Sequence, residues 1–168
     1  MDSYQKFISE KAKKKRDLLG KMFFPRQPVL LIDLEKQNFK KDIKDLLKGL
    51  SSIRLTTLVI GEKINLPNID SVHWLPESSG PAAYSAADFV IVLDSNAEPI
   101  LKKGCVPIAQ LNGDGTVDYN PIAEKGNGFY FKNPTAWEIF AAIVRALETY
   151  KFPYDWENLI TEVLKKKN

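Results

Sequence analysis

The sequence has very little cysteine and histidine: Cys105 and His73 are the only ones among 168 residues. One cysteine cannot form a disulfide within the chain, and one cysteine with one histidine cannot build a zinc site of the usual kind. Long apolar runs are also missing, since none approaches the roughly 20 residues of a membrane helix. The opening MDSYQKFISEKAKKKR lacks the apolar stretch of a secretory signal. We therefore expect a cytoplasmic protein, away from membranes, with no metal and no cofactor.

Positive charge is only slightly in excess, with a net charge of +3, but the basic residues are unevenly distributed. Basic residues gather in two segments, 11–16 and 165–167. Such clusters bind nucleic acid in some proteins, yet no aromatic side chains alternate with these lysines to form a stacking platform. A solvated helix face is the better interpretation, and nucleic-acid binding is kept as a minor hypothesis.

Apolar runs of strand length alternate with helical patterns along the whole chain. The hydrophobic content of 44% and the charged content of 27% are those of an ordinary soluble globular domain. Strands are predicted at 29–32, 55–60, 72–74, 89–93, 106–109 and 128–131. Helices are predicted at 2–22, 39–50, 82–87, 99–103, 135–150 and from about 155 onward. In the helix at 135–150 we expect an inward face made of Trp137, Phe140, Ala141, Val144 and Leu147.

This alternation supplies the crossover connections that parallel strands need. The sequence therefore predicts an α/β fold: a single Rossmann-like domain over 1–168, with a mainly parallel sheet and helices on both faces. Residues 1–22 are expected to form its leading basic amphipathic helix. A chain of 168 residues is long enough for one proper core, and no repeat or low-complexity linker divides it.

In a sheet of this type, ligands bind in the loops that follow the carboxyl ends of the strands. Glu98 follows the predicted strand at 89–93, where its carboxylate either meets a polar ligand or stabilises the start of the next helix. The loop 110–128 is rich in glycine, which lets backbone N–H groups approach a phosphate but is equally typical of plain turns. No Walker motif or complete G-x-G-x-x-G is present. His73 and Cys105 are interpreted as structural, and no catalytic residue is assigned.

Short motifs in a fixed order carry a resemblance to a known family. They are EKAKKKRDLL (10–19), LVIG (58–61), YSAADFVIV (84–92), Ser95 with Glu98-Pro99, KGCVPI (103–108), GNGFYF (126–131), and RALETY (145–150) followed by Pro153 and Trp156. Read together, they resemble the C-terminal, donor-binding half of bacterial glycogen and starch synthases, which are glycosyltransferases of the GT-B fold. The resemblance implies a donor site for a nucleotide sugar, ADP-glucose or UDP-glucose, at Glu98, Asn112, Gly113, Gly115 and Thr116.

The sequence departs from that family where the phosphates of the donor would bind. Asp33 stands where the family has an arginine, and Gln37 or Asn38 falls near the position of its lysine. An anion at this place repels a diphosphate. The segment after the Glu-Pro pair is shortened, which removes the family's second glutamate, and Asp114 adds a further negative charge. The family's N-terminal, acceptor-binding half is absent from the sequence.

Two main functional hypotheses follow, and they leave the question of enzymatic activity open. The first is a glycosyltransferase-like domain that is non-catalytic by itself and binds a nucleotide sugar or a glycan. The alternative is the donor-binding half of a split glucosyltransferase, whose separate N-terminal half supplies the acceptor site. The missing cations favour the first, because transfer needs positive charge where the diphosphate leaves. An anionic pocket also predicts a preference for a neutral sugar or a nucleoside, unless Lys36 or Lys102 folds inward.

Overall fold

Six strands of the chain form one parallel sheet. The computed structural model describes residues 3–37, 39, 42–93, 96–111 and 117–167. Every pair of neighbouring strands in the described sheet is parallel, which confirms the predicted fold class. The spatial order is β3-β2-β1-β4-β5-β6, and the strands are β1 (Val29–Asp33), β2 (Thr56–Ile60), β3 (Val72–Leu75), β4 (Phe89–Val92), β5 (Val106–Gln110) and β6 (Phe129–Phe131).

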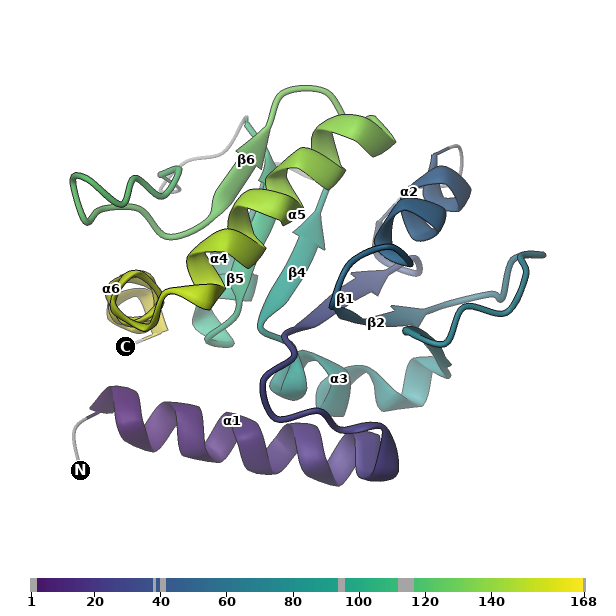
Figure 1. The fold of residues 1–168 in the computed structure, drawn as a ribbon, viewed down its shortest axis with the longest axis horizontal. Coiled ribbons are helices and arrows are strands. Elements are labelled where there is room, and N and C mark those ends of the chain that lie inside the picture. Colours follow the sequence, from purple (N-terminus) through teal and green to yellow (C-terminus); the bar gives the residue numbers. More distant parts are fainter. Residues whose placement is uncertain (1–2, 38, 40–41, 94–95, 112–116, 168) are drawn as a thin grey trace.

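Helices connect the strands and cover both faces of the sheet (Figure 1). Helices α2, α5 and α6 pack on one face and α3 packs on the other, while α1 and α4 contribute side chains to both. None of the helices within the described ranges is long and apolar enough to span a membrane. The bounds are α1 (Ser3–Leu19), α2 (Ile43–Leu50), α3 (Gly80–Ala86), α4 (Glu98–Lys102), α5 (Ala136–Lys151) and α6 (Pro153–Lys167), with short 3-10 turns η1 (Gly20–Met22) and η2 (Glu77–Ser79).

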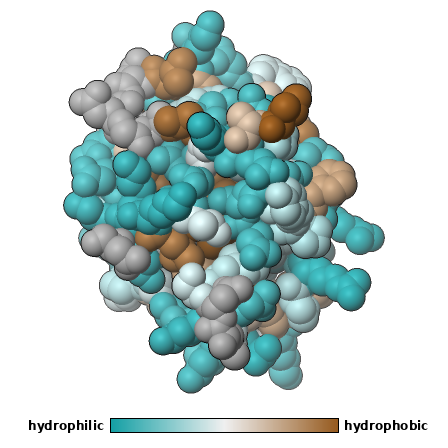
Figure 2. Space-filling model, turned by 90° about the vertical axis from the view of Figure 1, so that its left-hand side faces the viewer, coloured by the Kyte–Doolittle hydropathy of each residue, from teal (hydrophilic) through white to brown (hydrophobic). Residues whose placement is uncertain are grey.

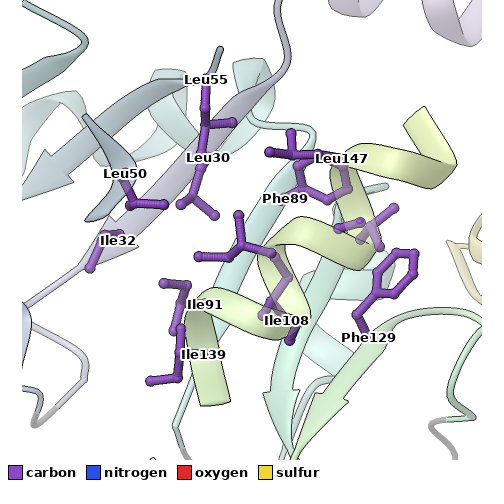
Figure 3. Packing of buried hydrophobic residues seen from close by; sticks show 14 of the residues in the cluster. Leu30, Ile32, Leu50, Leu55, Phe89, Ile91, Ile108, Phe129, Ile139 and Leu147 are labelled. Atoms are coloured by element: carbon purple, nitrogen blue, oxygen red, sulfur yellow. The ribbon is translucent and has the colours of Figure 1, made fainter. Parts of the chain in front are cut away.

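The side chains of each central strand divide between two hydrophobic clusters, one on each face of the sheet. In β1, Leu30 and Ile32 join the cluster beneath α2, α5 and α6, whereas Val29 and Leu31 join the other. Figure 3 shows Leu30 and Ile32 in the same cluster as Ile139 of α5. Successive side chains of a strand point to opposite faces, so a strand covered on both sides needs apolar residues throughout. This requirement explains why the central strands are uninterrupted apolar runs.

The inward face of α5 differs from the predicted one. Of the five residues expected to point inward, only Leu147 is buried, and Trp137 is 83% exposed. Both the expected and the observed sets have helical spacing, so the sequence pattern alone does not choose between them. The small side chains of Ala142 and Ala146 let the helix approach the sheet closely. The residues that α5 buries are Ile139, Ala142, Ile143, Ala146 and Leu147.

A buried ion pair connects α1 to the edge of the sheet where the strands begin. Lys15 Nζ lies 2.5 Å from Asp88 Oδ2, and Val29 N donates a hydrogen bond to the same oxygen over 2.8 Å. Lys15 and Asp88 are only 6% and 3% exposed. Asp88 directly precedes β4 and Val29 begins β1, so one carboxylate joins the starts of two neighbouring strands to the helix.

A second lysine of α1 reaches the same edge. Lys11 is buried, and its Nζ donates hydrogen bonds to the carbonyl oxygens of Ala87 and Gly104. Residues four positions apart share one face of a helix, and Lys11 and Lys15 lie on the inward one. The expected solvated face is therefore wrong for these two positions. The other basic residues of that segment are exposed, namely Lys13, Lys14 and Arg16.

The side of the molecule where α1 begins and α6 lies is mostly hydrophilic (Figure 2). Hydrophobic residues on this side lie in small, separate groups. Lysines 165–167 near the end of α6 are all exposed. The solvated interpretation thus holds for this second basic segment.

Replacing Lys15 by methionine should lower the free energy of unfolding by about 3 kcal/mol, because Asp88 then stays buried without its cation. Lys14→Met is the matched control: Lys14 is exposed on the same helix, and its replacement should change stability by less than about 0.5 kcal/mol. Urea unfolding followed by circular dichroism measures both changes. Equal unfolding midpoints for the two variants would contradict this role of the ion pair.

Candidate functional site

The carboxyl ends of the described strands meet at one edge of the sheet. Asp33 ends β1, Ile60 ends β2 and Gln110 ends β5. The first residues after these strands, Leu34, Gly61 and Leu111, lie at this edge, opposite the edge that holds Lys15 and Asp88. In doubly wound sheets this is where ligands bind, so it is the place to look for a site.

Of the predicted site residues, only Glu98 lies in the described part of the chain. It is the first residue of α4, its side chain is 62% exposed, and its Oε1 lies 2.8 Å from Lys102 Nζ. The hydrogen bond from Lys102 and its positive charge lower the pKa of Glu98. This position fits the alternative in which the carboxylate stabilises the start of a helix. The predicted residues outside the described ranges are Asn112, Gly113, Gly115 and Thr116, together with the neighbouring Asp114.

Asp33 is built into the fold at the position where the resemblance implies an arginine. The residue is 2% exposed, and Tyr84 Oη donates to its Oδ2 over 2.8 Å. The backbone N–H groups of Glu35 and Lys36 donate to Oδ1 over 3.2 and 3.3 Å. Lys36 Nζ also lies 3.6 Å from Oδ2. The chain itself therefore supplies hydrogen-bond partners to both oxygens of the carboxylate.

A neutral amide lies near the position of the expected lysine. Gln37 Oε1 accepts a hydrogen bond from Leu93 N over 2.7 Å. This hydrogen bond connects the loop after β1 to the residue that follows β4. The side-chain oxygen of Gln37 is therefore already bonded to a backbone N–H group. Asn38, the other residue considered for that position, lies outside the described residues. No phosphate-binding cation is thus found at the one described position of the two.

A cavity of about 590 Å³ opens at this edge beside β1, β2 and α3, and we refer to it as the carboxyl-edge pocket. The ring of Tyr84 forms part of its wall, with Lys36 Nζ 4.7 Å and Lys103 Nζ 3.9 Å from the ring centroid. Lys36 reaches Asp33 although 60% of its side chain is exposed, so it offsets only part of the expected negative charge, whereas Lys102 pairs with Glu98. Three carboxylates and two ammonium groups line the pocket: Asp33, Glu35, Glu77, Lys36 and Lys103.

Several residues of the carboxyl-edge pocket were not singled out from the sequence for this site, among them Tyr84, Glu77 and Lys103. Tyr84 is the one large residue in the run Pro-Ala-Ala-Tyr-Ser-Ala-Ala, a signal that could have found it. Glu77 and Lys103 carry no comparable signal. They come together with Asp33 only because β4 lies beside β1 in the sheet.

The described end of the loop between β5 and β6 is held by contacts around Asp118. Arg145 Nη1 lies 2.6 Å from Asp118 Oδ2, and Tyr130 N donates to Asp118 Oδ1 over 2.9 Å. Gly126 has a φ of +119°, and a Cβ there would lie 2.4 Å from Tyr119 Cα, so glycine is required. Tyr130 of the GNGFYF motif and Arg145 of the RALETY motif therefore both contact the carboxylate of Asp118.

The described residues offer groups for binding rather than a catalytic constellation. His73 lies in β3, and burial lowers its pKa. Cys105 is fully buried, and burial raises the pKa of its thiol, so it is a poor nucleophile. Both fit the structural interpretation. No group of three or more His, Cys, Asp or Glu residues able to hold a metal ion occurs in the part of the chain that the structure describes.

Solved structures that match the fold include a starch synthase and a protein bound to UDP and glucose. The catalytic domain of starch synthase IV from Arabidopsis thaliana, bound to ADP and acarbose, matches with a TM-score of 0.75 at 20% identity, over 94% of this chain and 39% of that chain. HepE of Anabaena, in complex with UDP and glucose, matches with a TM-score of 0.61 at 15% identity, over 94% of this chain and 50% of that chain. The fold is therefore that of a domain of a GT-B glycosyltransferase.

Sequence similarity points to glycogen synthases in particular, although no protein-family model matches the chain. Glycogen synthase 1 of Synechocystis sp. is 37% identical over 87 residues, which are 45% of this chain and 18% of the relative. The glycogen synthase of Oceanobacillus iheyensis is 35% identical over 101 residues, which are 54% and 21%. The chain thus spans about a fifth of the length of these curated relatives. It is homologous to glycogen synthases over about half of its own length, and its fold matches that of the starch synthase catalytic domain.

Replacing Tyr84 by phenylalanine should lower the free energy of unfolding by about 2 kcal/mol, because the buried carboxylate of Asp33 loses a hydrogen bond. Tyr154→Phe serves as the control, since Tyr154 is exposed and its hydroxyl bonds to Glu124 at the surface. Its loss should cost less than about 0.5 kcal/mol. Guanidinium unfolding curves give both values. If Tyr84→Phe is as stable as the control, Asp33 does not depend on this partner.

Proposed function

We propose that residues 1–168 form one glycosyltransferase-type domain that does not transfer sugar by itself and binds a neutral sugar or a nucleoside in the carboxyl-edge pocket. The observation that carries this proposal is the buried, hydrogen-bonded carboxylate of Asp33. Transfer from a nucleotide sugar develops negative charge on the departing diphosphate, which cations must stabilise. A carboxylate at the expected arginine position acts against that charge. Loss of one stabilising contact of this kind typically lowers kcat by about a hundredfold or more.

The charge balance of the carboxyl-edge pocket supports a ligand without phosphates. Its carboxylates outnumber its ammonium groups, and Asp33 already engages Lys36. Two like charges about 4 Å apart repel each other by about 4 kcal/mol at an effective dielectric constant of 20. The hydroxyl groups of a sugar or a ribose can instead donate to carboxylates and accept from Lys103. ADP-glucose, UDP-glucose and glycans are the ligands to examine, because the similar solved structures hold ADP or UDP.

A second candidate function is the donor-binding half of a split glucosyltransferase. One observation favours it: nearly all of this chain, 94%, matches only 39% of the starch synthase chain, so the domain corresponds to a part of a larger catalytic unit. A separate N-terminal half would then supply the acceptor site. Mixing this chain with the N-terminal half of a homologous glycogen synthase tests this candidate. Transfer of labelled glucose by the mixture, with none by either part, would favour it over the first proposal.

Nucleic-acid binding has less support from the structure than from the sequence. Lys11 and Lys15 are turned inward, which removes two charges from the basic segment of α1. The guanidinium of Arg16 lies 5.5 Å from the ring centroid of Phe23, within the chain itself. We also propose a cytoplasmic location, in line with a single buried and unpaired thiol at Cys105.

A thermal-shift screen of the whole chain tests the first proposal. Adenosine, uridine or malto-oligosaccharides should raise the melting temperature more than ADP or UDP at the same concentration, because a ligand that binds only the folded state stabilises it. A ligand at 100 times its Kd stabilises by about 2.7 kcal/mol, a shift of several degrees. The purified chain should transfer no labelled glucose from ADP-glucose or UDP-glucose to glycogen.

Two results would contradict the proposal in different ways. Robust transfer by the chain alone would show that it is an active enzyme. Larger shifts with ADP and UDP than with the nucleosides would show that the pocket accepts a diphosphate, and would favour the split enzyme. An NMR titration locates the site: signals of Tyr84 and Lys36 should move, and changes centred on residues 13–16 would place the ligand elsewhere.

A further inference from the structure

A second cavity of about 590 Å³ lies at the other edge of the sheet, where the strands begin. It is bordered by α1, by the segment between η1 and β1, and by the junction of α5 and α6. It shares no lining residue with the carboxyl-edge pocket. We call it the amino-edge cavity, and the lining residues that matter are Tyr4, Lys15, Phe23, Asp88, Tyr150 and Trp156.

The ion pair of Lys15 and Asp88 gives this cavity a polar floor with unused hydrogen-bonding capacity. An ammonium group carries three donors, and both oxygens of a carboxylate accept. Lys15 Nζ donates one hydrogen bond, to Asp88 Oδ2, and finds no second acceptor among the described residues. Asp88 Oδ2 also accepts from Val29 N, whereas Oδ1 has no hydrogen-bond partner in the described part of the chain. The spare donors and the spare acceptor therefore belong to buried residues that line one cavity.

Aromatic rings form much of the wall above this floor. The rings of Tyr150 and Trp156 meet edge to face, with their centroids 4.8 Å apart. Lys15 Nζ lies 5.9 Å from the ring centroid of Tyr150. Burial, together with the nearby charge of Asp88, raises the pKa of Tyr150, so its hydroxyl keeps its proton at neutral pH and can donate. Phe23 adds a half-buried ring from the segment before β1.

Of the four cations that line the amino-edge cavity, Lys15 and Lys151 are paired with carboxylates. The ion pair of the floor is neutral as a unit. Lys151 Nζ lies 2.6 Å from Glu148 Oε1, and Lys11 Nζ is directed at backbone carbonyl oxygens. Arg26 is the remaining cation of the lining, and it is exposed at the rim. A ligand that both donates and accepts hydrogen bonds suits this floor better than a phosphate.

We propose that the amino-edge cavity binds a neutral sugar, whose hydroxyl groups pair with Lys15, Asp88 and Tyr150 while its ring packs against Phe23 and Trp156. Sugars present neighbouring hydroxyls that donate and accept, together with an apolar face of C–H groups. A cavity with aromatic walls and a few converging polar groups matches both features, and its volume lies in the usual range for small-molecule sites. The proposal does not rest on the carboxyl-edge pocket. A sugar held here would also bridge α1 to the α5–α6 junction.

An NMR titration of the full chain with maltotriose tests this proposal. The indole N–H of Trp156 and the amides around Tyr150 should shift and saturate. Tyr150→Phe keeps the ring and removes one hydrogen bond, so it should weaken binding about fivefold. Phe23→Ala removes a ring and should weaken it about tenfold. Trp137→Ala is the control, because Trp137 is an exposed aromatic residue outside the cavity lining, and it should bind as the unmodified chain does.

Thermal melts establish that each variant is folded, and Phe23→Leu replaces Phe23→Ala if the latter is not. Shifts confined to Tyr84 and Lys36 would support the carboxyl-edge pocket and overturn this proposal. Trp156 shifts of the same size with inorganic phosphate would identify an anion site and also overturn it. So would an unchanged affinity in Tyr150→Phe and in the Phe23 variant.

Discussion

The buried ion pair between Lys15 and Asp88 holds the first helix and the starts of two strands in one arrangement. Two buried charges carry a desolvation cost of several kcal/mol each, which only good geometry and further hydrogen bonds offset. The amide of Val29 supplies one such bond to the carboxylate. Helix α1 places Phe7 in one core cluster and Leu19 in the other, so its docking closes both.

The buried carboxylates at the two edges of the sheet have different partners. At the amino edge, a carboxylate and an ammonium group neutralise each other beneath an aromatic cavity. At the carboxyl edge, Asp33 is buried and satisfied by Tyr84 and by backbone N–H groups, where homologous glycosyltransferases are implied to carry an arginine. The fold is that of a glycosyltransferase domain, but the electrostatics at its ligand edge oppose a diphosphate.

The sheet could be predicted from the sequence because strands covered on both faces are unbroken apolar runs, as in 89–92. The inward face of α5 could not, because a stripe with Trp137 and a stripe with Ile139 have the same spacing. The burial of Lys15 depends on Asp88, 73 residues further along the chain. The departure at Asp33 was visible in the sequence, whereas its contact with Tyr84 arises only from the packing of α3 beside β1.

We propose that the carboxylate of Asp33 decides which ligand charge the carboxyl edge accepts. Calorimetric titration of ADP into the unmodified chain and into Asp33→Asn, which keeps the shape and removes the charge, tests this dependence. We predict that ADP binds Asp33→Asn at least about tenfold more tightly, or about 1.4 kcal/mol, while the affinity for adenosine is unchanged. The exposed Asp45→Asn control should show no gain. Equal affinity of the unmodified chain and Asp33→Asn for ADP would show that the charge of Asp33 does not decide which ligand binds.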